Sequence, residues 1–226
     1  HGVSTLRLSS PYLQYDSNGT FRNVPLLLSH ACPCAGWFDG YKTPLVSDAS
    51  EAEEWTVKNN IDTVRLLREE EWKELNPQQK LDVLGVVLNI EIRYLGLNHE
   101  VYLKSSVLNG ETAAHYNHRD HEIVIDLGQL ETAAAADVLD SLCHECFHAY
   151  QYQMIALYED TPEKYRNMLL FQYVGSYIEE TSNYNDGSGD LMDYYYQTVE
   201  VQARQYAELA VADYYGRIRE CLTTED

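Results

Sequence analysis

Residues 144–148 read His144-Glu145-Cys146-Phe147-His148, and this stretch governs how the rest of the chain is interpreted. Residues four apart on a helix lie about 40° from each other around its axis, so His144 and His148 share one face. Two imidazoles on one face can bind the same tetrahedral metal ion. Glu145 lies about 100° from His144, close enough to reach a metal-bound water without being a ligand. A pair of buried structural histidines is the alternative.

The metal that suits this motif is zinc. A bound Zn2+ lowers the pKa of its water toward about 7, and a nearby carboxylate can take the proton while the water attacks a carbonyl carbon. The same carboxylate can then give the proton to the leaving amine. The motif therefore predicts that His144 and His148 bind Zn2+ and that Glu145 is the general base.

A catalytic zinc site needs a third protein ligand. No histidine follows His148 in the sequence, so a ligand downstream of it must be Asp or Glu. We favour Glu200, because the small residue Ala203 beside it would let its helix pack closely on the metal helix. Glu179 and Glu180 are the competing candidates, and we expect both to face solvent.

This combination resembles the zincin metallopeptidases of the Glu-ligand type, the gluzincins, to which thermolysin belongs. The resemblance is carried by His144, Glu145, His148 and the Glu-x-x-Ala pattern at 200–203, and it covers roughly residues 100–221. It implies a zinc-dependent metallopeptidase with a zincin-like catalytic domain.

The resemblance also implies a place for the substrate. In that family the sheet before the metal helix has an edge strand that binds extended peptides. Glu122–Leu127 stands in the matching place, which implies that a peptide or protein substrate adds to the sheet there. One position departs from the pattern: thermolysin-like enzymes carry an Asp four residues after the ligand Glu, and this chain has Arg204. The fit is therefore to the broad superfamily, in a bacterial branch, rather than to thermolysin.

Attack on a carbonyl creates an oxyanion that needs a hydrogen-bond donor. The chain has 19 tyrosines, most of which we expect at the edge of the core. Tyr196 lies on the same face of the expected helix as Glu200, so it is one candidate donor. Arg204 shares that face and is an equal candidate, with a salt bridge as its simpler role. His115 and His118 precede the expected substrate strand, and we interpret them as surface turn residues rather than cleft residues.

Hydrophobic periodicity predicts an α+β fold. Apolar residues recur at helical spacing on both sides of Asn76-Pro77, which restarts a helix as its cap and first turn. Ala113–Asn117 is predicted to pair with Glu122–Leu127 across a turn at 118–120. We expect a small, mostly antiparallel sheet packed on several helices, including the metal helix. The predicted layout is an irregular segment over 1–49 and one zincin-like domain over 50–226, with helices in 50–97, the sheet in 100–127, and metal and ligand helices in 131–221.

Composition excludes two classes of function. The formal net charge is −20, whereas contacts with nucleic-acid phosphates need clustered Lys and Arg. No run of 18 apolar residues occurs, so the sequence predicts no membrane span.

Two features bear on the cellular compartment and point in opposite directions. The chain begins at His1 rather than Met, so we expect a processed or trimmed piece, which slightly favours export or the cell envelope. Five cysteines leave at least one thiol unpaired in the monomer, which favours a reducing compartment. Cys32 and Cys34 could form half of a structural metal site, or one of them could fold onto the zinc as a thiolate and block it. Ordinary thiols are the default interpretation.

The sequence thus predicts a zinc-dependent hydrolase, with a peptidase as the favoured form. Two alternatives stay open. One is a zincin-shaped binding or scaffold protein without turnover, against which the intact Glu145 argues. The other is a metal hydrolase that acts on a substrate other than a peptide, which the motif alone does not separate from a peptidase.

Overall fold

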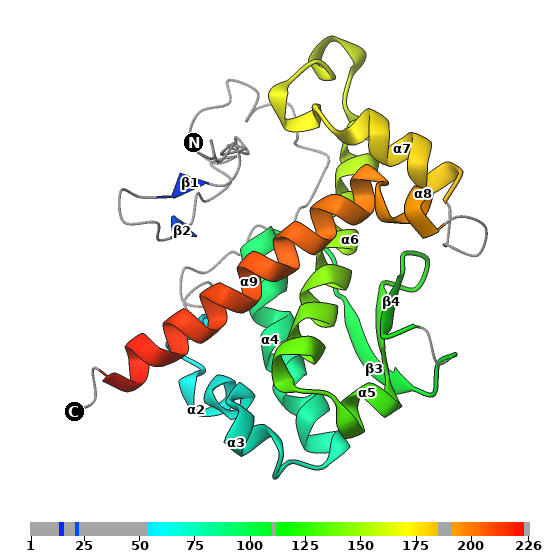
Figure 1. Ribbon diagram of the computed structural model, residues 1–226. Helices are drawn as coiled ribbons and strands as arrows, with labels where there is room; N and C mark the ends of the chain where they lie inside the picture. Colours follow the sequence, from blue (N-terminus) through cyan, green and yellow to red (C-terminus); the bar gives the residue numbers. More distant parts are fainter. Residues whose placement is uncertain (1–13, 16–20, 23–53, 110–111, 185–190, 224–226) are drawn as a thin grey trace, which may run out of the picture. The chain divides into compact units, whose positions relative to one another are not determined.

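The computed structural model describes residues 14–15, 21–22, 54–109, 112–184 and 191–223 (Figure 1). The chain divides into two units, His1–Leu45 and Val46–Asp226. In the first unit, β1 (Gln14–Tyr15) pairs antiparallel with β2 (Phe21–Arg22). The rest of the segment expected to be irregular, including Cys32 and Cys34, lies outside the described residues.

The second unit is a mainly helical α+β structure with a small sheet, which confirms the predicted class. Its strands are β3 (Tyr102–Ser106), β4 (Ala114–Asn117) and β5 (Glu122–Asp126). Its helices are α2 (Ile61–Val64), α3 (Glu69–Trp72), α4 (Pro77–Leu95), α5 (Leu127–Thr132), α6 (Ala135–Asp160), α7 (Val174–Ser182), α8 (Leu191–Tyr195) and α9 (Thr198–Thr223), with 3-10 turns at Arg65–Leu67, Glu163–Tyr165 and Leu169–Phe171.

Helix α4 begins where the sequence predicts it. The Asn76 side chain accepts a hydrogen bond from the Gln79 N–H, and the Gln79 side chain accepts one from the Asn76 N–H, so the two form a capping box. Gly96 ends the helix in the left-handed conformation, at φ 66°. The helical spacing before Asn76 does not form one continuous helix, because Arg68 adopts an extended conformation with ψ 141° and separates α2 and its 3-10 turn from α3.

The sheet is mixed, with strand order β3-β5-β4. β4 pairs antiparallel with β5, as predicted, but β3 pairs parallel with β5. The expectation of a mostly antiparallel sheet is therefore wrong. The chain leaves β3, crosses to the far side of β5 to form β4, and turns back at 118–121 into β5, so β3 and β5 run in the same direction.

This topology corrects the expected substrate strand. β5 lies between two other strands, so Glu122–Leu127 offers no free sheet edge. Its residues Ile123, Val124 and Ile125 are all buried, as expected for a strand covered on both faces. The edges of the described sheet are β3 and β4.

Helix α6 contacts both the sheet and α9, which crosses it in Figure 1 (α6 green, α9 orange to red). Three fully buried alanines, Ala149, Ala203 and Ala207, allow α6 and α9 to pack closely. The core between α4, α6, α9 and the sheet holds these two helices in place, and they carry the candidate site.

Among the described residues, none of the helices combines the length and the hydropathy that crossing a bilayer requires.

Candidate metal centre

Helices α6 and α9 bring together the three residues that the sequence predicts as metal ligands. His144 and His148 stand one turn apart on α6, and Glu200 lies in the first turn of α9 with its side chain fully buried. The two Nε2 atoms are 3.0 Å apart. His144 Nε2 lies 3.3 Å from Glu200 Oε2, and His148 Nε2 lies 3.4 Å from Glu200 Oε1.

These separations fit the coordination shell of a small metal ion. Bonds of about 2.0–2.2 Å at tetrahedral angles place ligand atoms roughly 3.3 Å apart. The three ligand atoms of His144, His148 and Glu200 all lie within 4.8 Å of one another, so the group could hold a metal ion. Two imidazoles and one carboxylate also form the donor set that zinc enzymes of the thermolysin type use.

The state of the His148 ring also suits metal binding. Its Nδ1 lies 2.8 Å from Oε1 of Gln151, a side chain that is only 1% exposed. An amide oxygen accepts hydrogen bonds, so Nδ1 carries a proton, and Nε2 is the ring nitrogen that faces Glu200 and His144 and could bind a metal ion. The other end of the Gln151 amide donates to the Val199 carbonyl at 2.9 Å.

The Glu200 carboxylate collects further hydrogen bonds from two tyrosines. Tyr184 donates to Oε1 at 2.7 Å and Tyr194 to Oε2 at 2.8 Å. Burial opposes ionisation of Glu200, yet the hydrogen bonds with His144 and His148 hold its pKa well below the usual range. Burial and the neighbouring Glu200 charge raise the pKa of both tyrosine hydroxyls, so they stay protonated as donors.

The competing acidic residues have other positions. Glu179 is exposed, as expected. Glu180 does not simply face solvent: its carboxylate accepts the N–H groups of Thr198 and Val199, each at 2.9 Å. These are unpaired donors at the start of α9, so Glu180 caps the helix that carries Glu200.

Glu145, the expected general base, is next to the ligands and only 8% exposed. Burial opposes protonation of the His148 ring, but its hydrogen bond to Glu200 and the nearby Glu145 charge raise the pKa of His148. The Glu145 charge also contributes to the raised pKa of Tyr194, behind burial and Glu200. Its carboxylate is therefore within electrostatic reach of one ligand and one tyrosine of the cluster.

The two remaining candidates differ in position. Arg204 lies 3.7 Å from Glu200 Oε2, one turn further along α9; its guanidinium also donates to the Tyr195 carbonyl and lies 3.9 Å from the centre of the Tyr195 ring. Tyr196 is 68% exposed and contacts the Tyr195 ring. The structure therefore brings Arg204 to the cluster but leaves Tyr196 outside it.

Sequence reasoning missed Gln151, Tyr184 and Tyr194. Gln151 had a readable signal, since it lies three residues after His148 on the face that carries both histidines. Tyr184 had none, because it reaches Glu200 through tertiary packing.

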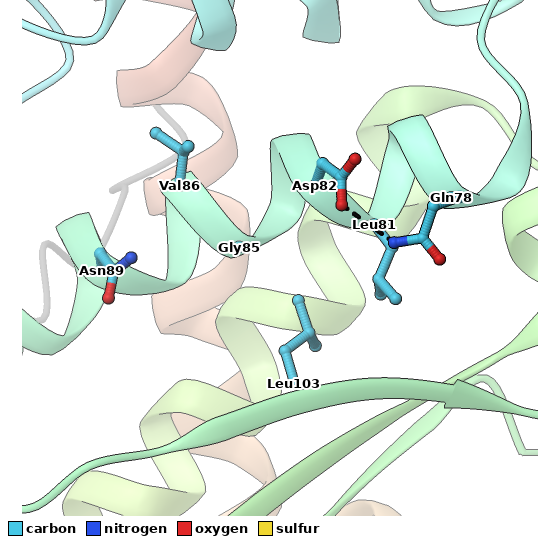
Figure 2. Close-up of a pocket in the computed structure, with 7 residues that line it drawn as sticks. All are labelled: Gln78, Leu81, Asp82, Gly85, Val86, Asn89 and Leu103. Carbon is cyan, nitrogen blue, oxygen red and sulfur yellow. Dashed lines mark hydrogen bonds between the residues drawn. The ribbon is translucent and has the colours of Figure 1, made fainter.

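Two other regions are separate from this cluster. His115 and His118 are exposed, as predicted, although His115 lies in β4 rather than in a turn; His118 stacks on Tyr152 with ring centres 4.4 Å apart. An open surface hollow of about 440 Å³ lies between α4 and Leu103 (Figure 2). Figure 2 shows Gln78 of α4 hydrogen-bonded to Asp82 on its wall. The wall offers one carboxylate and no histidine, so it lacks the donor set of the cluster.

Comparisons of the chain with models of protein families, with curated proteins and with solved structures find no match. The geometry of the chain itself defines a candidate metal centre of two histidines and one glutamate on two packed helices.

Proposed function

We propose that this protein is a zinc-dependent hydrolase, and that it acts as a metallopeptidase. The observation that carries the proposal is the buried triangle of His144 Nε2, His148 Nε2 and the Glu200 carboxylate, with edges of 3.0, 3.3 and 3.4 Å. The adjacent Glu145 adds a second, non-ligand carboxylate, which hydrolytic zinc sites use as a base.

Each residue then has a defined task. His144, His148 and Glu200 hold the metal, which, when bound, would acidify a water and polarise a carbonyl. Glu145 accepts a proton from the attacking water and passes it to the leaving amine. Tyr194 donates its one hydroxyl proton to the Glu200 carboxylate, so it holds this ligand in place and would have to release that hydrogen bond to serve as the oxyanion donor expected of Tyr196. Arg204, one turn further along α9, stabilises the negative charge of the Glu200 carboxylate.

A peptide substrate would bind as an added strand on β4 rather than on β5. β4 is an edge of the sheet and contacts α6, the helix that carries both histidines. An extended peptide can pair its main chain with such an edge while its scissile bond lies over the adjacent helix.

The test combines metal analysis with Glu145→Gln. We expect the purified protein to bind one zinc ion, and the variant to keep the metal while peptide hydrolysis falls by about 10²–10⁴-fold, the usual contribution of a general base. Glu179→Gln, an exposed change on α7, is the matched control and should retain full activity.

Other outcomes separate the alternatives. Zinc binding without hydrolysis of any peptide in a broad library would favour a binding or scaffold protein. Loss of hydrolysis of a non-peptide ester or amide on Glu145→Gln, with peptides untouched, would favour a different hydrolase. Absence of stoichiometric zinc, or normal peptide cleavage by Glu145→Gln, would overturn the proposal.

A further inference from the structure

Gln151 is a buried polar side chain between the two helices that carry the ligands. It lies on α6, one turn after His148, and is 1% exposed. Both ends of its amide are occupied: Oε1 lies 2.8 Å from His148 Nδ1, and Nε2 donates to the Val199 carbonyl at 2.9 Å. Burying an amide is costly unless its donor and acceptor are both satisfied, and here each faces a group of defined chemistry.

The orientation of this amide is forced by its partners. A backbone carbonyl can only accept a hydrogen bond, so the NH2 end of Gln151 must face Val199. Its oxygen must therefore face the imidazole, and Nδ1 of His148 must donate to it. The remaining ring nitrogen, Nε2, has no contact with Gln151; it lies 3.4 Å from Glu200 Oε1 and 3.0 Å from His144 Nε2.

We infer that Gln151 is the positioning residue of the metal centre, because it holds a proton on Nδ1 of His148, orients the ring, and fixes the register between α6 and α9. Val199 immediately precedes the ligand Glu200, and its N–H is held by Glu180. Gln151 thus joins His148 to Val199 by two hydrogen bonds, the peptide bond joins Val199 to Glu200, and Glu200 Oε1 lies 3.4 Å from His148 Nε2. A shift of α9 along α6 would break the Gln151–Val199 bond and move the Glu200 carboxylate away from both imidazoles.

The consequence for metal binding rests on the proposed function, whereas the effect on the proton at His148 Nδ1 does not require a metal. The two are therefore measured separately. The chain offers a matched control in Gln153 on the same helix. The Gln153 amide makes the same kind of two-sided bridge, accepting from the Asn98 N–H at 2.7 Å and donating to the Gly96 carbonyl at 2.9 Å, but it touches no ligand.

The experiment compares Gln151→Met with Gln153→Met in the full chain. Zinc affinity is measured by chelator competition, and the ring nitrogens are read by 15N NMR on histidine-labelled protein without metal. We expect Gln151→Met to weaken zinc binding about 10- to 100-fold, as loss of a ligand's hydrogen-bond partner does elsewhere. In the metal-free protein, His148 Nδ1 should be protonated in the wild type and should lose part of that proton in Gln151→Met. Gln153→Met should leave both readouts unchanged.

Gln151→Glu provides a rescue of the same shape, because it still offers an oxygen to Nδ1. We expect it to keep Nδ1 protonated and to bind zinc more tightly than Gln151→Met. It also serves as the test if the Met variant does not fold: a folded Gln151→Glu protein with His148 Nδ1 only partly protonated would overturn the inference. Unchanged Nδ1 protonation and affinity in folded Gln151→Met would overturn it as well. If the wild type binds no zinc, the proposed function fails, while Nδ1 protonation in the metal-free protein still decides the role of Gln151.

Discussion

Two buried carboxylates in this protein have closely similar partners and opposite electrostatic states. Glu200 at the candidate metal centre is fully buried and accepts hydroxyl hydrogen bonds from Tyr184 and Tyr194. Glu91 on α4, in the main core, is 3% exposed and accepts hydroxyl hydrogen bonds from Tyr206 and from Tyr214. Each carboxylate thus has a pair of tyrosine donors in a site that excludes water.

The difference lies in what else surrounds each carboxylate. Burial raises the pKa of Glu91 to about 7, although hydrogen bonds from its two tyrosines act to lower it. At Glu200 the same burial is outweighed by hydrogen bonds with His144 and His148, and the pKa falls well below its usual range. Two hydroxyl donors do not keep a buried carboxylate ionised, but nearby imidazoles do. A buried glutamate beside two histidines therefore has the properties of a metal ligand, while Glu91 serves as a link between α4 and α9.

The largest expected difference between the two carboxylates is the effect on zinc affinity when each is neutralised. We expect Glu200→Gln to reduce zinc affinity by about 10³-fold. The free energy of zinc binding at a structural site with four ligands is about 10–16 kcal/mol, which averages about 2.5–4 kcal/mol for each ligand. A ligand that also supplies negative charge should contribute about 4 kcal/mol, at the upper end of this range. Titration with zinc against a chromophoric chelator measures the change. Glu91→Gln is the control, and a comparable loss of affinity in that variant would contradict the distinction between the two carboxylates.

The second prediction concerns the pH dependence of stability. The pKa of Glu91 is about 7 in the folded protein, above the ordinary 4.5 of the unfolded chain. Its contribution to the free energy of unfolding is therefore fully present below pH 4.5 and is lost as pH rises toward 7, by roughly 3 kcal/mol in all. Glu91→Gln removes this loss and keeps a side chain that can pair with both tyrosines.

Urea unfolding at several pH values checks this expectation. The variant should match the wild type near pH 4.5 and become the more stable protein by pH 8. Since the other carboxyl groups titrate in both proteins, the difference between the two curves isolates Glu91. Parallel curves over this range would show that Glu91 is ionised in the fold and would remove the contrast with Glu200.

Local rules of the sequence predicted much of this arrangement. The spacing of His144 and His148 places both on one helical face, and the absence of a later histidine points to an acidic third ligand. The start of α4 at Asn76-Pro77 and the pairing of β4 with β5 also follow from cap and turn residues.

What the sequence could not predict depends on tertiary contacts. The parallel pairing of β3 follows from the side of β5 on which β4 lies, and no residue pattern encodes that choice. Tyr194 rather than Tyr196 meets Glu200 because α8 ends at Tyr195 and a break precedes α9, so a helical wheel drawn through both segments gives the wrong face. The partners of Glu91 lie 115 and 123 residues away along the chain.

The smallest expected effects come from removing one tyrosine hydroxyl at each carboxylate. They test whether Glu91 acts on stability and Glu200 on zinc affinity. Tyr214 is 3% exposed, so Tyr214→Phe leaves a buried carboxyl oxygen without its donor and should lower the free energy of unfolding by about 1–2 kcal/mol. Tyr184 is 48% exposed, so water can replace its hydroxyl, and Tyr184→Phe should cost less than about 0.5 kcal/mol of stability. Its effect should appear in zinc affinity instead, as a loss of up to about tenfold, because the Glu200 carboxylate loses a group that orients it. Denaturation and zinc titration of both variants give four values. If Tyr184→Phe loses stability and Tyr214→Phe loses zinc affinity, the assignment of one carboxylate to the core and the other to the metal is wrong.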